Sequence, residues 1–299
     1  MIDTRIKSLR DDALAARVQA HLNQQTKPPG ALGRLETLAL QLAMIQGTAQ
    51  PLLQAPQLLV CAADHGLAAQ GVSAYPQEVT LQMVNNMLAG GAAISVLARQ
   101  HGIALTVVDC GVRGELAAQP GLLAAKIAPG TADSSLGPAM TPTQCDTALA
   151  RGAAFAHRLP GNALLLGEMG IGNTSAAALL MARLSGLPLW QCVGRGTGID
   201  DAGLAHKLGV LQRVLLLHKA AVEPLAALAA FGGLEIAVMA GAVLQAARER
   251  RLIVVDGFIS TAAVAVAAAL APAVLERCVF SHCSAESGHA GRAAGAGHG

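Results

Sequence analysis

The chain of 299 residues is long enough for one large domain, or for one domain with a small appendage. Its 21 Lys and Arg residues nearly balance 19 Asp and Glu residues, and aromatic residues make up only 2%. This composition argues against a nucleic-acid-binding platform and gives no reason to expect a membrane surface as partner. The charged N-terminus lacks the apolar segment of a secretory signal, so we expect a cytoplasmic protein.

The first fifty residues are expected to form a small helical subdomain, residues 1–50. Leu35, Leu38, Leu42 and Ile45 recur at helical spacing after the break "TKPPGALG". The remainder is assigned to one domain, residues 51–289. The last residues, 290–299, are low in complexity and are expected to be a disordered tail.

Short apolar runs alternate with longer helical patterns in the large domain. The expected strands are 58–64, 103–109, 163–168, 252–257 and 278–282, and the expected crossover helices are 78–100, 173–185, 202–219 and 234–250. The runs are apolar throughout, as in strands covered on both faces, so we predict a Rossmann-like α/β fold with a mostly parallel sheet. The apolar stretch from Gly257 is interpreted as a buried core helix, because Pro272 ends it early.

Polar residues close each of these runs. They are Asp64-His65-Gly66, Asp109-Cys110-Gly111, Glu168-Met169-Gly170, Asp256-Gly257 and Ser281-His282. Because the carboxyl ends of parallel strands meet at one edge of a sheet, we expect a shared ligand-binding crevice there. For any single Asp, an ordinary turn is the better interpretation, but the five strand ends together favour a site.

The cysteines give little reason to expect a metal. None of the six forms a C-x-x-C pair, so reduced and packed thiols are expected. Cys278, His282, Cys283 and His289 lack the spacing of a zinc site. We therefore predict neither a metal nor a cofactor.

A glycine-rich turn, "GEMGIGNTS", follows the third expected strand. It differs from a triphosphate-binding loop because Asn173 replaces the lysine and Glu168 adds a negative charge. A strand–glycine–helix unit presents backbone N–H groups to an anion, and a single phosphate requires neither lysine nor metal. The candidate phosphate-binding residues are Gly170, Gly172, Asn173 and Thr174. A purely structural turn is the alternative, and a degenerate nucleoside triphosphatase is disfavoured.

Two further segments are candidates for the same crevice. The cluster "VGRGTGIDDAG" offers Gly194, Arg195, Gly196, Thr197 and Gly198 to a second anionic group, and its Asp200-Asp201 pair is typical of a helix N-cap and first turn. The segment from Ala63 to Ile94 holds Tyr75, the only tyrosine, which together with Met83 could form a pocket for a flat ring. Ser73 or Gln82 would orient that ring.

These motifs together resemble the nicotinate-nucleotide:dimethylbenzimidazole phosphoribosyltransferase family of cobalamin synthesis. The resemblance runs from about Leu22 to His289 through "KPPGALGRLE", "ADHG", "GVSAYPQEVT", "NNMLAGGAAI", "GEMGIGNTS", "GRGTGIDDAG", "FGGLEIAVMAGAVL", "VVDGFISTAA" and "FSHCSAESGH". It implies transfer of the 5-phosphoribosyl group of nicotinate mononucleotide to a benzimidazole nitrogen, with inversion at the anomeric carbon and release of nicotinate. The family is homodimeric.

The resemblance also implies roles for individual residues. Gly170, Gly172, Asn173 and the 194–198 loop would hold the phosphate and ribose, and Glu168 would lie at the reacting centre. Lys207 would contact an anionic group of the nucleotide, although a solvated helix lysine is the alternative. Ser73, Tyr75 and Gln82 would line the benzimidazole pocket.

The family's general base is a glutamate in a further C-terminal segment, and no such motif follows "FSHCSAESGH" in this sequence. We interpret residues 290–299 as a truncated or frame-shifted end, with Glu168 or Glu286 as a weak substitute base. The alternative function is therefore a catalytically weak or inactive protein that binds a nucleotide or benzimidazole.

Overall fold

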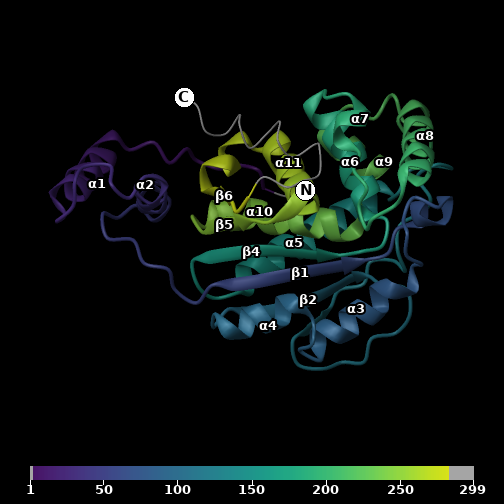
Figure 1. Cartoon of the computed structure of the whole chain (residues 1–299), viewed down its shortest axis with the longest axis horizontal. Coiled ribbons are helices and arrows are strands. Elements are labelled where there is room, and N and C mark those ends of the chain that lie inside the picture. Colours follow the sequence, from purple (N-terminus) through teal and green to yellow (C-terminus); the bar gives the residue numbers. More distant parts are fainter. Residues whose placement is uncertain (1–2, 283–299) are drawn as a thin grey trace.

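The computed structural model describes residues 3–282. The expected tail, 290–299, lies outside these residues, as do Cys283, Glu286 and His289. The core is a six-stranded sheet in the order β3-β2-β1-β4-β5-β6, in which every pair of neighbours is parallel (Figure 1). The predicted α/β fold is confirmed, and the strand order is that of a Rossmann sheet.

The strands occupy the predicted apolar runs with small shifts at their ends. They are β1 Gln57–Ala63, β2 Ala104–Gly111, β3 Leu122–Ala124, β4 Ala163–Met169, β5 Leu252–Val255 and β6 Cys278–Phe280. The short strand β3 was not predicted, because three residues are too few to show an apolar run. Its place at the edge depends on pairing with β2, where Leu122 lies opposite Val107.

Both faces of β1 are covered, which explains its uninterrupted apolar run. All seven residues of β1 are buried. Leu59, Cys61 and Ala63 belong to the larger core, and the alternate residues Leu58, Val60 and Ala62 belong to a second core on the opposite face. The two-residue repeat of the strand thus divides one apolar run between two helical layers.

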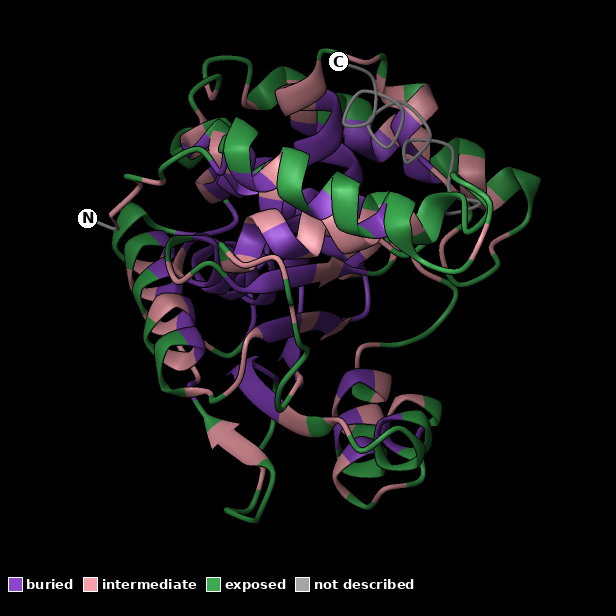
Figure 2. Ribbon diagram, turned by 90° about the vertical axis from the view of Figure 1, so that its left-hand side faces the viewer, coloured by how far each residue is buried: buried purple, intermediate pink, exposed green. Residues whose placement is uncertain are grey.

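Helices form a layer on each face of the sheet (Figure 1). The larger layer contains α5 Pro142–Arg158, α6 Asn173–Ser185, α10 Leu234–Arg248 and α11 Gly257–Leu270, and the smaller layer contains α3 Glu78–Leu88 and α4 Ala93–Gln100. The shorter elements are η1 Gly66–Gln70, α7 Leu189–Cys192, α8 Asp201–Leu217, α9 Pro224–Phe231 and η2 Pro272–Arg277. Figure 2 shows buried residues concentrated in the sheet and in the inner helices.

Small residues allow α5 and α10 to pack closely. A Cβ atom on Gly152 would lie 1.9 Å from the Val238 oxygen, and one on Gly241 would lie 2.0 Å from the Leu149 oxygen. Any side chain at either position would push the two backbones apart. This contact gives a structural reason for a composition rich in alanine and glycine and poor in aromatic residues.

Two expectations about apolar helices have different outcomes. The stretch from Gly257 is the buried helix α11, as predicted. The single helix expected at 78–100 is wrong, because the chain turns at Gly90, whose φ is +80°, and divides into α3 and α4. Within residues 3–282, only Glu78–Gln100 has the length and apolarity of a membrane span, and that stretch contains this turn.

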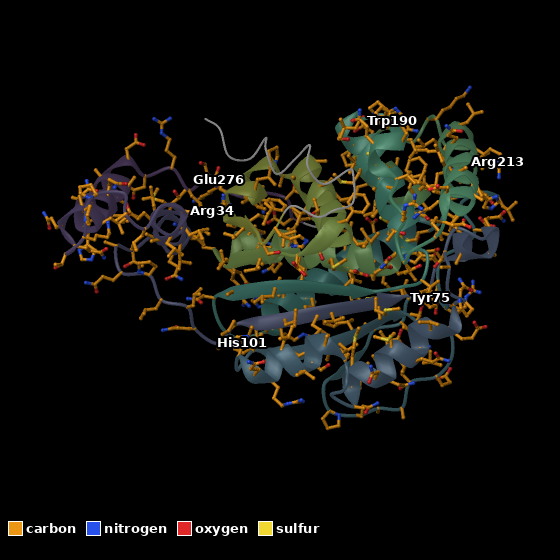
Figure 3. All side chains as sticks on the ribbon, in the orientation of Figure 1. Arg34, Tyr75, His101, Trp190, Arg213 and Glu276 are labelled. Atoms are coloured by element: carbon orange, nitrogen blue, oxygen red, sulfur yellow. The ribbon has the colours of Figure 1, made fainter. Side chains whose placement is uncertain are left out.

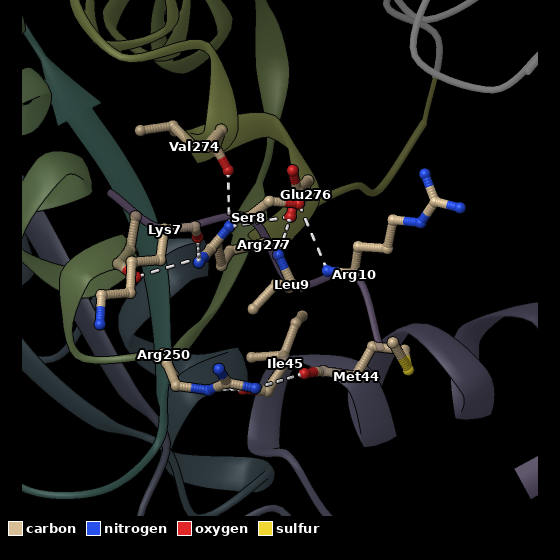
Figure 4. Close-up of polar contacts among 12 residues, drawn as sticks. Lys7, Ser8, Leu9, Arg10, Met44, Ile45, Arg250, Val274, Glu276 and Arg277 are labelled. Atoms are coloured by element: carbon tan, nitrogen blue, oxygen red, sulfur yellow. Dashed lines mark hydrogen bonds and ion pairs between the residues drawn. The ribbon is translucent and has the colours of Figure 1, made fainter. Parts of the chain in front are cut away.

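The N-terminal helices α1 Asp12–Gln24 and α2 Arg34–Gln46 project to one side of the sheet (Figure 1). Two arginines attach this part of the chain to the rest (Figure 4). Arg250 donates to the Ile45 and Met44 oxygens at 2.8 and 2.7 Å, and the buried Arg277 donates to the Lys7 oxygen. The division of the chain at residue 50 stays a prediction.

The cysteines at 61, 110, 145, 192 and 278 are free and buried, as expected of packed thiols. Among residues 3–282, no group of three or more His, Cys, Asp or Glu residues is arranged to hold a metal ion. Cys283 and His289, two of the weighed zinc ligands, lie outside this range.

Candidate functional site

The candidate site lies where the strand order reverses, between the central strands β1 and β4. These strands run in parallel, so Asp64-His65 after β1 and Glu168 near the end of β4 lie at the same edge. Open α/β sheets bind ligands at such a switch point. The structure therefore brings the polar residues at the ends of the two central strands to one edge, as predicted, and the shared crevice stays a prediction.

The outer strand ends contribute less than the sequence analysis expected. Asp109 accepts a hydrogen bond from the Val112 N–H at 2.8 Å and shapes its own turn. Ser281 donates to Asp256 at 2.5 Å, and the His282 ring lies 3.1 Å from the same carboxylate. For Asp109, the ordinary-turn interpretation is the better one.

The glycine turn after β4 is shaped by close backbone packing. A Cβ atom on Gly170 would lie 2.3 Å from the Ala63 oxygen, so no side chain fits there. Gly172 has a φ of +93° and is the N-cap of α6, which begins at Asn173 as predicted. The positive end of the α6 dipole therefore faces the edge of the sheet, where it favours an anion.

Glu168 lies at the base of this turn and is partly buried. The pKa of its carboxyl is raised to about 7, chiefly by burial and also by the nearby charges of Glu235 and Asp256. The Asn173 hydrogen bond and the His65 charge oppose this rise. Asn173 donates its side-chain N–H to the Glu168 carboxylate. Glu168 can therefore exist in either protonation state near neutral pH.

Lys207 joins the first glycine turn to the second. Its side chain is buried, and Nζ donates to Thr174 Oγ1 at 3.0 Å and to the Gly194 oxygen at 3.2 Å. A Cβ atom on Gly196 would lie 3.5 Å from this Nζ, so the 194–198 loop closes over the ammonium group. The alternative of a solvated helix lysine is wrong.

The rest of the second glycine loop is more exposed. Arg195 donates to the Ile199 oxygen at 3.0 Å and pairs with Asp201, so its guanidinium group is engaged by its own loop. Asp200 accepts from the Gly203 N–H at 2.8 Å and is the N-cap of α8, as predicted. Thr197 and Gly198 are exposed at the tip of the loop.

The segment 63–94, which was expected to bind a flat ring, contacts the 194–198 loop through Ser73. Ser73 Oγ lies 3.4 Å from Thr197 Oγ1. Tyr75 is 53% exposed and lies beyond the end of β1 (Figure 3), and Gln82 is exposed on α3. Met83 packs against the core under α3 and α4. The structure thus brings Ser73 to the loop and leaves Tyr75 and Gln82 open to solvent.

The sequence did not indicate that His65 and Glu235 form a buried ion pair. His65 Nε2 lies 2.7 Å from Glu235 Oε1, and the side chains are 2% and 0% exposed. Burial disfavours the imidazolium ion, but the charges of Glu235, Asp64 and Glu168 together raise the pKa of His65. The sequence places His65 at a strand end. Nothing in the sequence links it to Glu235, which lies 170 positions away.

Comparisons with known proteins agree on one family. A family model described as phosphoribosyltransferase matches residues 7–294. A Variovorax paradoxus protein named nicotinate-nucleotide–dimethylbenzimidazole phosphoribosyltransferase is 66% identical over 95% of this chain and 82% of its own length. A Cupriavidus necator protein of the same name is 61% identical over 93% of this chain and 82% of its own length.

Solved structures give the same result. The crystal structure of CobT from Thermus thermophilus superposes with a TM-score of 0.92 at 44% sequence identity. The match covers 95% of this chain and 86% of that one. The similarity therefore includes both the N-terminal helices and the sheet.

Proposed function

Because this chain belongs to the nicotinate-nucleotide–dimethylbenzimidazole phosphoribosyltransferase family, we propose that it transfers 5-phosphoribose from nicotinate mononucleotide to 5,6-dimethylbenzimidazole or a related base. The products are α-ribazole 5′-phosphate, nicotinate and the proton that the benzimidazole N–H loses. The relatives named above carry both substrates in their names. The observation that carries the proposal is the convergence of two glycine turns on buried Lys207 at the switch point of the sheet.

The nucleotide phosphate would bind at the start of α6. Gly170 and Gly172 allow a close approach to the backbone, and Asn173 and Thr174 begin the helix. Lys207 supplies a positive charge from the opposite side of this turn. A monophosphate matches one helix N-terminus and one ammonium group.

The second glycine loop would close over the ribose. Gly196 and Gly198, which both have a positive φ, let the loop bend after Gly194, and Arg195 and Thr197 supply donors at its tip. Its contact with Ser73 links this loop to the acceptor side of the site. Tyr75 and Gln82 would then cover the benzimidazole ring, which would bury their exposed surfaces.

Glu168 would stabilise the positive charge that develops on the sugar as the bond to nicotinate breaks. Nicotinate leaves as a neutral pyridine from a pyridinium, so its departure needs no protonation. A carboxylate close to an oxocarbenium-like centre lowers the energy of that transition state. With a pKa of about 7, Glu168 is substantially ionised under neutral conditions.

Calorimetry with nicotinate mononucleotide, followed by an assay of nicotinate release in the presence of dimethylbenzimidazole, tests this function. We expect saturable binding of the nucleotide and release of nicotinate that depends on the base. Binding without release would favour the alternative of a catalytically inactive binding protein. No binding of the nucleotide would contradict both.

We further propose that the protein is a cytoplasmic homodimer. Apolar side chains of α7 and α8 are exposed, and Trp190 and Leu216 are 64% and 71% accessible. A shallow cleft of about 240 Å³ between α6, α7 and α8 is lined by Leu187, Leu189 and Leu215 together with Ala182 and Arg183. Exposed apolar surface next to a cleft is typical of a protein interface. Recovery of the activity in the cytosolic fraction of cells tests the location.

A further inference from the structure

A buried ion pair lies beneath the proposed phosphate turn, and it takes no part in the function described above. His65 Nε2 and Glu235 Oε1 are 2.7 Å apart. His65 follows β1, and Glu235 lies in the first turn of α10, whose N-terminal end favours a negative charge. The pair therefore joins the end of the central strand to the start of the central helix.

The imidazole ring is enclosed by glycines. A Cβ atom on Gly170 would lie 3.4 Å from ring atoms Cδ2 and Nε2, and one on Gly233 would lie 2.4 Å from Cε1. A Cβ atom on Gly172 would lie 3.5 Å from the Cβ atom of His65. Gly170 and Gly172 belong to the proposed phosphate turn, so the turn is packed directly against this histidine.

The surroundings of the pair are mostly acidic. The charges of Asp64 and Glu168 add to that of Glu235 in raising the pKa of His65. Glu235 also raises the pKa of the buried Cys110 thiol of β2, and Asp256 raises that of Glu168. Among residues 3–282, Glu235 Oε2 has no hydrogen-bond partner although it is buried. Burying such a pair costs desolvation that its own attraction does not fully offset, so stability alone is a weak reason for its presence.

We propose that His65 and Glu235 are a positioning pair for the phosphoribosyl transfer. The imidazole ring supports the Gly170–Gly172 turn from below, and the pair fixes the electrostatic environment of the Glu168 carboxyl at the base of that turn. This inference rests on the proposed function and adds two residues that touch neither substrate.

Glu235→Gln changes the charge with little change in shape, because the amide oxygen can still accept from the imidazole. Glu168 then loses the charge of Glu235, the strongest neighbouring charge that raises its pKa. If His65 also loses its proton, the smaller opposing influence of the imidazolium is lost as well. In both cases the pKa of Glu168 falls below about 7, toward the ordinary range of a glutamate.

A ¹³C NMR titration of glutamate carboxyl groups measures this change without any substrate. The Glu168 resonance is assigned by its loss in Glu168→Gln. We expect the midpoint of Glu168 to move down by about one pH unit in Glu235→Gln. A purely structural pair would lower the melting temperature and leave this midpoint in place.

A double variant, His65→Gln with Glu235→Gln, tests the support of the turn while leaving no unpaired buried carboxylate. We expect its dissociation constant for nicotinate mononucleotide, measured by calorimetry, to rise about tenfold or more, because small displacements of binding groups are costly.

His157→Gln is the matched control. It removes another histidine–glutamate pair, His157 with Glu249 at 2.6 Å, at the opposite end of α10. The control should bind the nucleotide like the wild type.

Either of two results would overturn the positioning role. One is an unchanged Glu168 midpoint in Glu235→Gln, and the other is wild-type nucleotide affinity in a folded double variant. A wild-type protein that does not bind nicotinate mononucleotide would instead contradict the proposed function, and the substrate-free titration separates that failure from a failure of the pair.

Discussion

Among the single residues of the site, Lys207 has the clearest expected effect on the nucleotide. Its buried Nζ contacts Thr174 and the Gly194 oxygen, so it stands between the two glycine turns. Lys207→Met keeps most of the side-chain volume and removes the charge. We expect nucleotide affinity to fall about tenfold to a hundredfold, since a charge-assisted contact with an anion contributes about 1.5–3 kcal/mol. The folded state should lose little stability, because the removed charge was buried.

Arg195→Met provides the comparison for Lys207→Met. Arg195 is about half exposed and is held by Ile199 and Asp201 of its own loop. Its loss should weaken nucleotide binding less than the loss of Lys207, as measured by calorimetry on both variants. Equal effects, or a larger effect at Arg195, would contradict the placement of the phosphate beside Lys207.

At the level of elements, α6 has a glycine with positive φ at each end, which makes a matched experiment possible. Gly172, the N-cap, has a φ of +93°, and Gly186, the C-cap, has a φ of +73°.

An alanine in this backbone region is strained by about 1–2 kcal/mol. We expect Gly172→Ala and Gly186→Ala both to lower the free energy of unfolding, measured in urea, by about this amount. Only Gly172→Ala should also weaken nucleotide binding, because its Cβ atom would press on Ala68 at 3.2 Å and shift the proposed phosphate turn. A Cβ atom on Gly186 would meet no atom within 4 Å. Similar nucleotide affinities in the two variants would show that the start of α6 does not hold the phosphate.

The same helix shows which elements could be predicted from sequence. Glycines bound α6 on both sides, so its limits, 173–185, were predicted correctly. The division between α3 and α4 depends on one turn at Gly90 inside an otherwise helical pattern, and the short strand β3 depends on its partner. A local sequence pattern predicts a helix or strand whose ends are marked by residues close to it in the sequence. It does not predict an element whose existence or ends depend on packing against another part of the chain.

The candidate site divides in the same way. Glu168, Asn173 and the Gly170–Gly172 turn lie in one continuous segment, and the sequence showed them together. The contact of Lys207 with Thr174 spans 33 positions, and the His65–Glu235 pair spans 170. Such long-range contacts follow from the order of the strands, which no local motif encodes.

For the whole molecule, the proposed dimer predicts a specific effect of charge on α8. In a two-fold interface each subunit contributes the same surface, so residues near the axis face their own copies. Leu216 is 71% exposed on α8, and its neighbour in sequence, Leu215, lines the cleft between α6, α7 and α8. Leu216→Lys would place two like charges and two desolvated ammonium groups in that interface. We therefore expect sedimentation velocity to show a dimer for the wild type and a shift toward monomer for this variant.

Leu97→Lys is the control for a general effect of surface charge. Leu97 is 54% exposed on α4, which belongs to the helical layer on the opposite face of the sheet. This variant should remain dimeric, because α4 lies away from the proposed interface. Circular dichroism should show that both variants are folded, since each replaced side chain is mostly in solvent. A monomeric wild type, or dissociation by Leu97→Lys in place of Leu216→Lys, would contradict an interface built on α7 and α8.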